Sequence, residues 1–127
     1  MRSRTIVVAA AALAVAALAF ASAASAKDGD VRVAGSCTGA ATSKLKLSEE
    51  DGRIEVEFEV DQNRNGVTWK VTLFRNGTRF ARTQATTRAP SGSFEVRRLA
   101  ANGSGTDTIR ARAVSPSGQV CTARASF

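Results

Sequence analysis

The sequence predicts an all-β protein built as a two-sheet antiparallel sandwich of seven to eight strands. Three observations lead to this fold class. Apolar and polar residues alternate through most of the chain after residue 26, residues that favour turns recur about every 8–12 residues, and no segment there repeats apolar residues at helical spacing. The 101 residues from 27 to 127 suffice for one core, and no repeat or low-complexity linker divides them. One β-sandwich domain is therefore expected over residues 27–127.

Four strands are expected in the first half of the domain. Residues 54–60 give the clearest signal, because Ile, Val and Phe alternate there with three glutamates. The strand over residues 67–73 leads into the Asn-Gly pair at positions 76 and 77, a strong hairpin signal because a type I′ turn requires positive φ at both central residues. The same alternation predicts strands over residues 31–37 and 44–47.

Three further turn or loop signals divide the second half, at residues 89–92, 102–105 and 115–118. The returning strand of the hairpin begins around Phe80 and Arg82 and runs into a polar stretch. The remaining strands are expected over residues 94–96, 109–113 and 121–127.

The two cysteines predict a disulfide. Cys37 and Cys121 lie 84 residues apart, in the first and last expected strands, and both fall on the inward phase. An even cysteine count in an exported protein indicates a disulfide, and two cysteines permit one pairing. A pair of metal ligands would need His or further Cys to complete a site, and the sequence has neither. Closing so long a loop is worth about 4–5 kcal/mol in the chain-entropy model.

The first 26 residues have the layout of a secretory signal peptide. Arg2 and Arg4 precede an apolar run over residues 6–20, and a stretch of small residues ends in Ala24-Ser25-Ala26. Cleavage is expected between Ala26 and Lys27, which predicts a secreted, extracellular protein. An uncleaved anchor is the alternative, because the small apolar residues extend past residue 20. No later stretch is long and apolar enough for a membrane anchor after cleavage.

Residues 67–77, with the sequence VTWKVTLFRNG, resemble the third strand and hairpin of immunoglobulin-like domains, including small exported bacterial ones. The resemblance covers about a dozen residues and is architectural over the rest of the domain. It implies an immunoglobulin-like sandwich in which Trp69 is buried. The cysteines stand at the ends of the domain instead of on the second and sixth strands, and the absence of Tyr removes the tyrosine corner.

The residue types present argue against an enzyme. Without His there is no Ser-His-Asp or Cys-His arrangement and no imidazole base, and a disulfide would consume both thiols. Glu55, Glu57 and Glu59 are about 6.5–7 Å apart along one strand face, a spacing that suits an acid–base pair. An open sheet face in water offers neither a cleft nor desolvation, so these side chains are expected to pair with Lys or Arg across strands.

One loop resembles half of a calcium site. Asp61, Asn63 and Asn65 stand at the first, third and fifth places, and Gly66 stands at the sixth. The twelfth place, where a calcium loop needs a bidentate Glu, is Thr72. The alternative is a turn built from residues that tolerate positive φ. A weak Ca²⁺ site is the one cofactor that the sequence suggests.

Charge points to an acidic partner. Without Arg2 and Arg4, 16 basic side chains remain against 11 acidic ones, a net charge of +5. Lys70, Arg110, Arg112 and Arg124 are expected to point outward from neighbouring strands of one sheet, with the loop Asn63 to Gly66 beside them. The other sheet is expected to carry mixed charges. We therefore expect an acidic surface polymer or an acidic protein as partner, and the alternative is a face that only confers solubility. Nucleic acid is not expected, because the stripe lacks stacking aromatics and a helix for a groove.

Two other functions remain as alternatives. A secreted, loop-based inhibitor of an enzyme such as a protease would use Thr86-Thr87-Arg88-Ala89-Pro90-Ser91, where an Arg precedes a rigid turn. A carrier for a small apolar ligand is suggested by analogy with exported bacterial chromophore-binding sandwiches, which carry more disulfides. The sequence predicts no oligomeric state.

Overall fold

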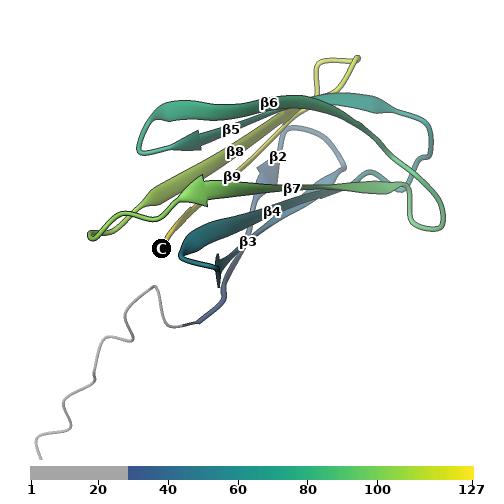
Figure 1. The fold of residues 1–127 in the computed structure, drawn as a ribbon. Coiled ribbons are helices and arrows are strands. Elements are labelled where there is room, and N and C mark those ends of the chain that lie inside the picture. Colours follow the sequence, from purple (N-terminus) through teal and green to yellow (C-terminus); the bar gives the residue numbers. More distant parts are fainter. Residues whose placement is uncertain (1–28) are drawn as a thin grey trace, which may run out of the picture.

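The computed structural model describes residues 29–127, which form two antiparallel β-sheets that pack face to face (Figure 1). One sheet has four strands in the order β1-β3-β4-β7, and the other has five in the order β2-β9-β8-β5-β6. The strands are β1 (Val31–Ala34), β2 (Ser36–Cys37), β3 (Thr42–Glu50), β4 (Arg53–Asp61), β5 (Thr68–Arg75), β6 (Thr78–Thr86), β7 (Ser93–Ala101), β8 (Thr108–Val114) and β9 (Val120–Ser126). The prediction of an all-β, two-sheet antiparallel fold is confirmed.

The expected signal peptide and its cleavage site lie outside the described residues. Within residues 29–127, no helix has the length and apolar character needed to cross a bilayer.

The first strand differs from the prediction, because the chain changes sheets at Gly35. The single strand expected over residues 31–37 is two short strands, with β1 paired to β3 and β2 paired to β9. The Gly35 amide donates a hydrogen bond to the Ser43 carbonyl (2.8 Å), and a Cβ on Gly35 would lie 2.5 Å from the Thr122 carbonyl oxygen. A side chain does not fit where the chain crosses between the two sheets, which explains both the glycine and the ninth strand.

The inward phases expected from the alternation form the core. The apolar side chains of β3, β4, β5, β8 and β9 that were expected to point inward are buried between the sheets. Trp69 is fully buried, with its ring 6.2 Å from that of Phe94, and its indole N–H donates a hydrogen bond to Gln62 Oε1 (3.1 Å). The expected burial of Trp69 is therefore confirmed, and its polar atom is satisfied.

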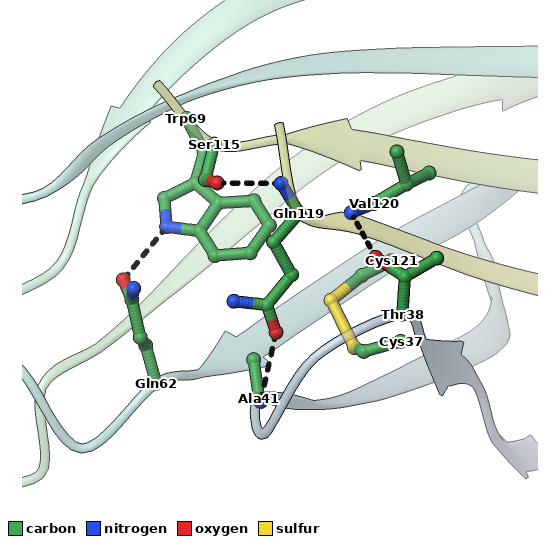
Figure 2. Close-up of a disulfide and its surroundings, with 9 residues drawn as sticks. All are labelled: Cys37, Thr38, Ala41, Gln62, Trp69, Ser115, Gln119, Val120 and Cys121. Carbon is green, nitrogen blue, oxygen red and sulfur yellow. Dashed lines mark hydrogen bonds between the residues drawn. A yellow bond between two sulfur atoms is a disulfide. The ribbon is translucent and has the colours of Figure 1, made fainter. Parts of the chain in front are cut away.

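The predicted disulfide between Cys37 and Cys121 is present and joins β2 to β9 (Figure 2). The two cysteines are directly opposite in the five-stranded sheet, so the bond fixes the edge strand β2 to its neighbour. Hydrogen bonds support the same junction. The Val120 amide donates to Thr38 Oγ1 (3.0 Å), and the Ala41 amide donates to Gln119 Oε1 (2.9 Å).

Candidate anion-binding face

The outward side of the five-stranded sheet is strongly basic. The structure places the four predicted residues on adjacent strands, with Lys70 on β5, Arg110 and Arg112 on β8, and Arg124 on β9. Lys70, Arg112 and Arg124 are exposed, and Arg110 is half-buried. Two further arginines that the sequence reasoning missed, Arg79 and Arg82 on β6, are also exposed on this side. We call the outward side chains Lys70, Arg79, Arg82, Arg110, Arg112 and Arg124 the basic face.

The strand register arranges the basic face in rows that run across the strands. In one row Arg112 lies between two threonines, Thr122 and Thr72, and Thr72 is opposite Arg82. In the next row two arginines are directly opposite each other, and the row comprises Arg124, Arg110, Phe74 and Arg79. The expectation that the stripe lacks an aromatic side chain is therefore wrong, because Phe74 lies within it. The six cations therefore lie on one side of four neighbouring strands, β9, β8, β5 and β6, which are about 4.8 Å apart.

A β-bulge accounts for the position of Arg82. Register in the β5–β6 hairpin shifts between Leu73 and Phe74, so that Phe74 is opposite Arg79 whereas Leu73 is opposite Ala81. Phe80 is the extra residue, and it is partly buried against the core. Without the shift Arg82 would be opposite an inward-pointing residue. The bulge therefore turns its side chain to the outward face.

The basic face has no acidic partner of its own. The five strands of this sheet contain no Asp and no Glu. Within residues 29–127, none of the six cations of the basic face forms an ion pair. Arg110 makes a cation–π contact instead, since its guanidinium lies 4.0 Å from the centroid of the Phe74 ring. The acid Asp107 in the β7–β8 loop is buried and holds Arg75 at the end of β5 (2.7 Å).

The four-stranded sheet carries mixed charges that pair with one another, as expected. Glu57 forms ion pairs with Lys46 (3.3 Å) and with Arg97, and Arg97 also approaches Glu55 (3.8 Å) and Glu95 (3.4 Å). These carboxylates, Glu57 above all, raise the pKa of Arg97 above its usual value. Glu55 and Glu57 of β4 thus serve as cross-strand partners, whereas Glu59, which was also expected to pair, forms no ion pair among the described residues.

The loop that resembles half of a calcium site forms a local turn. Asp61 Oδ1 accepts a hydrogen bond from the amide of Asn63 (3.0 Å), and Asn63 has a φ of 54°. Asn63 and Asn65 are exposed. In the described part of the chain, no three or more His, Cys, Asp or Glu side chains gather as a metal-binding group. The calcium site at Asp61, Asn63 and Asn65 stays a prediction.

The loop proposed for an inhibitor is held by the neighbouring loop. Thr87 is buried, and its hydroxyl donates a hydrogen bond to the Arg64 carbonyl (2.6 Å) and accepts one from the Val67 amide (3.0 Å). Arg88 is exposed, but its amide already donates to the Ser93 carbonyl (2.9 Å). The Arg88 amide is therefore not free to donate a hydrogen bond to the backbone of a protease, as the amide of an extended inhibitor loop would. Inhibition stays a prediction that this geometry does not favour.

Comparison of the sequence with protein-family models and with curated proteins finds no match.

Proposed function

We propose that this protein is a secreted, non-catalytic binding module that holds an acidic polymer of the cell surface on its basic face. One observation carries the proposal. Six cations share the outward side of one sheet without an acidic residue among them, whereas the opposite sheet carries both signs and pairs Glu57 with Lys46 and Arg97.

Solubility alone does not require such a separation of charge. A surface that only confers solubility intersperses both signs, as the four-stranded sheet does with Lys46, Glu57 and Arg97. Like charges directly opposite each other destabilise a sheet, so the pairing of Arg110 with Arg124 has a cost in stability. A bound polyanion would remove that cost.

Secretion and the absence of catalysis belong to the same proposal. The disulfide is compatible with an oxidising, extracellular compartment, and the first 26 residues have the layout of a signal peptide. The chain has no His, the disulfide occupies both cysteines, and Glu55 and Glu57 are engaged with Arg97. A role in binding needs none of these groups to be reactive.

The test is co-sedimentation of the purified protein with isolated cell-wall material at low and at high salt. We expect retention at low salt that is lost at high salt, because exposed charges are screened. The double variant Arg82→Thr/Arg112→Thr should bind about 30-fold more weakly, since each cation near an anionic surface contributes about 1 kcal/mol. Its melting temperature should change little.

The matched control is Lys44→Thr/Arg53→Thr, which removes the same charge from exposed positions of the four-stranded sheet. This control should keep most of the binding. Equal losses in the two double variants would show that net charge alone matters, and the assignment of the face would then be wrong. A wild-type protein that is not retained even at low salt would contradict the proposed function.

A further inference from the structure

Within the basic face, Arg110 and Arg124 form a pair that the other rows do not contain. They are directly opposite each other on β8 and β9. The Cβ atoms of such a pair lie about 4.5–5.5 Å apart, and like charges there repel. Arg112, in the next row, has a threonine on either side. The pair therefore concentrates positive charge at one point of the face.

The guanidinium of Arg110 is held in position before any ligand binds. It stacks on the Phe74 ring at 4.0 Å from the centroid, and its side chain is half-buried. A guanidinium stacked by its face keeps its N–H groups at the edge, free to donate. Because the side chain is already ordered, binding costs less conformational entropy.

Hollows open on both sides of the pair. One of about 240 Å³ is lined by Phe74, Asn76, Gly77 and Thr108 together with the two arginines. A second of about 420 Å³ is lined by the two arginines and by residues of the crossing segment and of β9, namely Ala34, Gly35, Ser36, Thr122 and Ala123. A ligand group can therefore reach both guanidinium groups without displacing a side chain from the core.

The wall of the smaller hollow is rigid. The side chain of Asn76 donates to Asp107 Oδ1 (2.9 Å), and its carbonyl oxygen accepts from the Thr108 amide (2.8 Å). Asp107 is itself buried, and its carboxylate is paired with Arg75.

We propose that Arg110 and Arg124 together bind one tetrahedral oxyanion, a phosphate or sulfate ester group of the acidic polymer. A guanidinium presents two parallel N–H donors, and two guanidinium groups present twice as many. The two oxygens of a carboxylate lie in one plane and suit one such fork, whereas the oxygens of a tetrahedral ester do not share a plane and can face two forks from different directions. This inference identifies the chemical group that the basic face binds, and it rests on the proposed function.

The test uses variants that keep the charge and change the donor geometry. Arg110→Lys and Arg124→Lys are compared with Arg53→Lys, a control at an exposed position of the four-stranded sheet, by isothermal titration calorimetry at low salt. The probes are sodium polyphosphate, dextran sulfate and poly-L-glutamate. We expect Arg110→Lys and Arg124→Lys to weaken polyphosphate or dextran sulfate binding about tenfold, and Arg53→Lys to change it less than about twofold.

Poly-L-glutamate binding should change equally little in all three variants. The probes distinguish a phosphate group from a sulfate ester, because the polymer that shows the tenfold effect carries the group that the pair recognises. Equal polyphosphate and dextran sulfate affinities in all three variants would overturn the site and leave the proposed function standing. A wild-type protein that binds none of the polyanions would instead contradict the proposed function. Tighter binding of a single-stranded oligonucleotide than of either ester polymer would overturn the surface polymer as the source of the group.

Discussion

The two outward faces of the sandwich follow the same alternation but treat charge differently. On the four-stranded sheet, Lys46 and Arg97 flank Glu57 and form ion pairs with it. On the five-stranded sheet, Arg110 is opposite Arg124 and no acid is present. Folding requires outward positions to be polar but does not fix the sign of the charge. The segregation of cations on one sheet is therefore a property that the fold does not explain and that the proposed binding would explain.

The largest expected effect on stability comes from removing the disulfide, which joins two strands of the five-stranded sheet. The double variant Cys37→Ala/Cys121→Ala should lose about 4–5 kcal/mol of unfolding free energy, because the bond closes an 84-residue loop. Equilibrium unfolding in urea measures the loss. Reduction of the wild-type disulfide should reproduce it. A loss below about 1 kcal/mol would mean that β2 needs no covalent link to β9.

Substitutions on the four-stranded sheet and on the basic face should differ in their effect on the free energy of unfolding. Glu57→Gln should lower the unfolding free energy by about 1 kcal/mol, because the Glu57 side chain is 11% exposed and serves two cations. Arg112→Gln, on the basic face, should change it by less than about 0.5 kcal/mol, since Arg112 has no ion pair among the described residues.

Urea unfolding at two salt concentrations tests the contrast. The effect of Glu57→Gln should shrink at high salt, because screening weakens the pairs that the substitution removes. If Arg112→Gln costs as much as Glu57→Gln, the two faces do not differ in the way proposed.

Most of the fold could be predicted because a period of two leaves little freedom. A shift of one residue in strand register would expose all the apolar side chains of that strand to solvent. The alternation therefore predicts which side chains point inward, including Trp69 and Phe58, which are both buried. The Asn-Gly turn was also readable, and both of its residues have positive φ, 48° at Asn76 and 82° at Gly77. These signals are local, which is why a single sequence contains them.

What could not be predicted depends on distant neighbours. The break at Gly35 is set by Ser43 and Thr122, which approach from other strands. Arg79 was within reach, because a two-residue turn places it opposite Phe74. Arg82 was not, because its orientation depends on the bulge at Phe80, which no local pattern announces. The candidate face was therefore predicted in its centre and missed along β6.

The smallest expected gain in stability comes from a substitution that should change stability and binding in opposite directions. Arg124→Glu places a carboxylate opposite Arg110 and converts a repulsive pair into an attractive one. The unfolding free energy should rise by about 0.5 kcal/mol, since cross-strand charge pairs contribute about 0.2–1 kcal/mol. Polyphosphate binding should be lost, because the new carboxylate both occupies Arg110 and repels the ligand. Arg124→Gln should fall between the wild type and Arg124→Glu in both measurements. If Arg124→Glu gains stability and still binds polyphosphate, the Arg110–Arg124 pair exists for a reason other than ligand binding. If Arg124→Glu loses stability, the two guanidinium groups do not repel each other on the folded sheet.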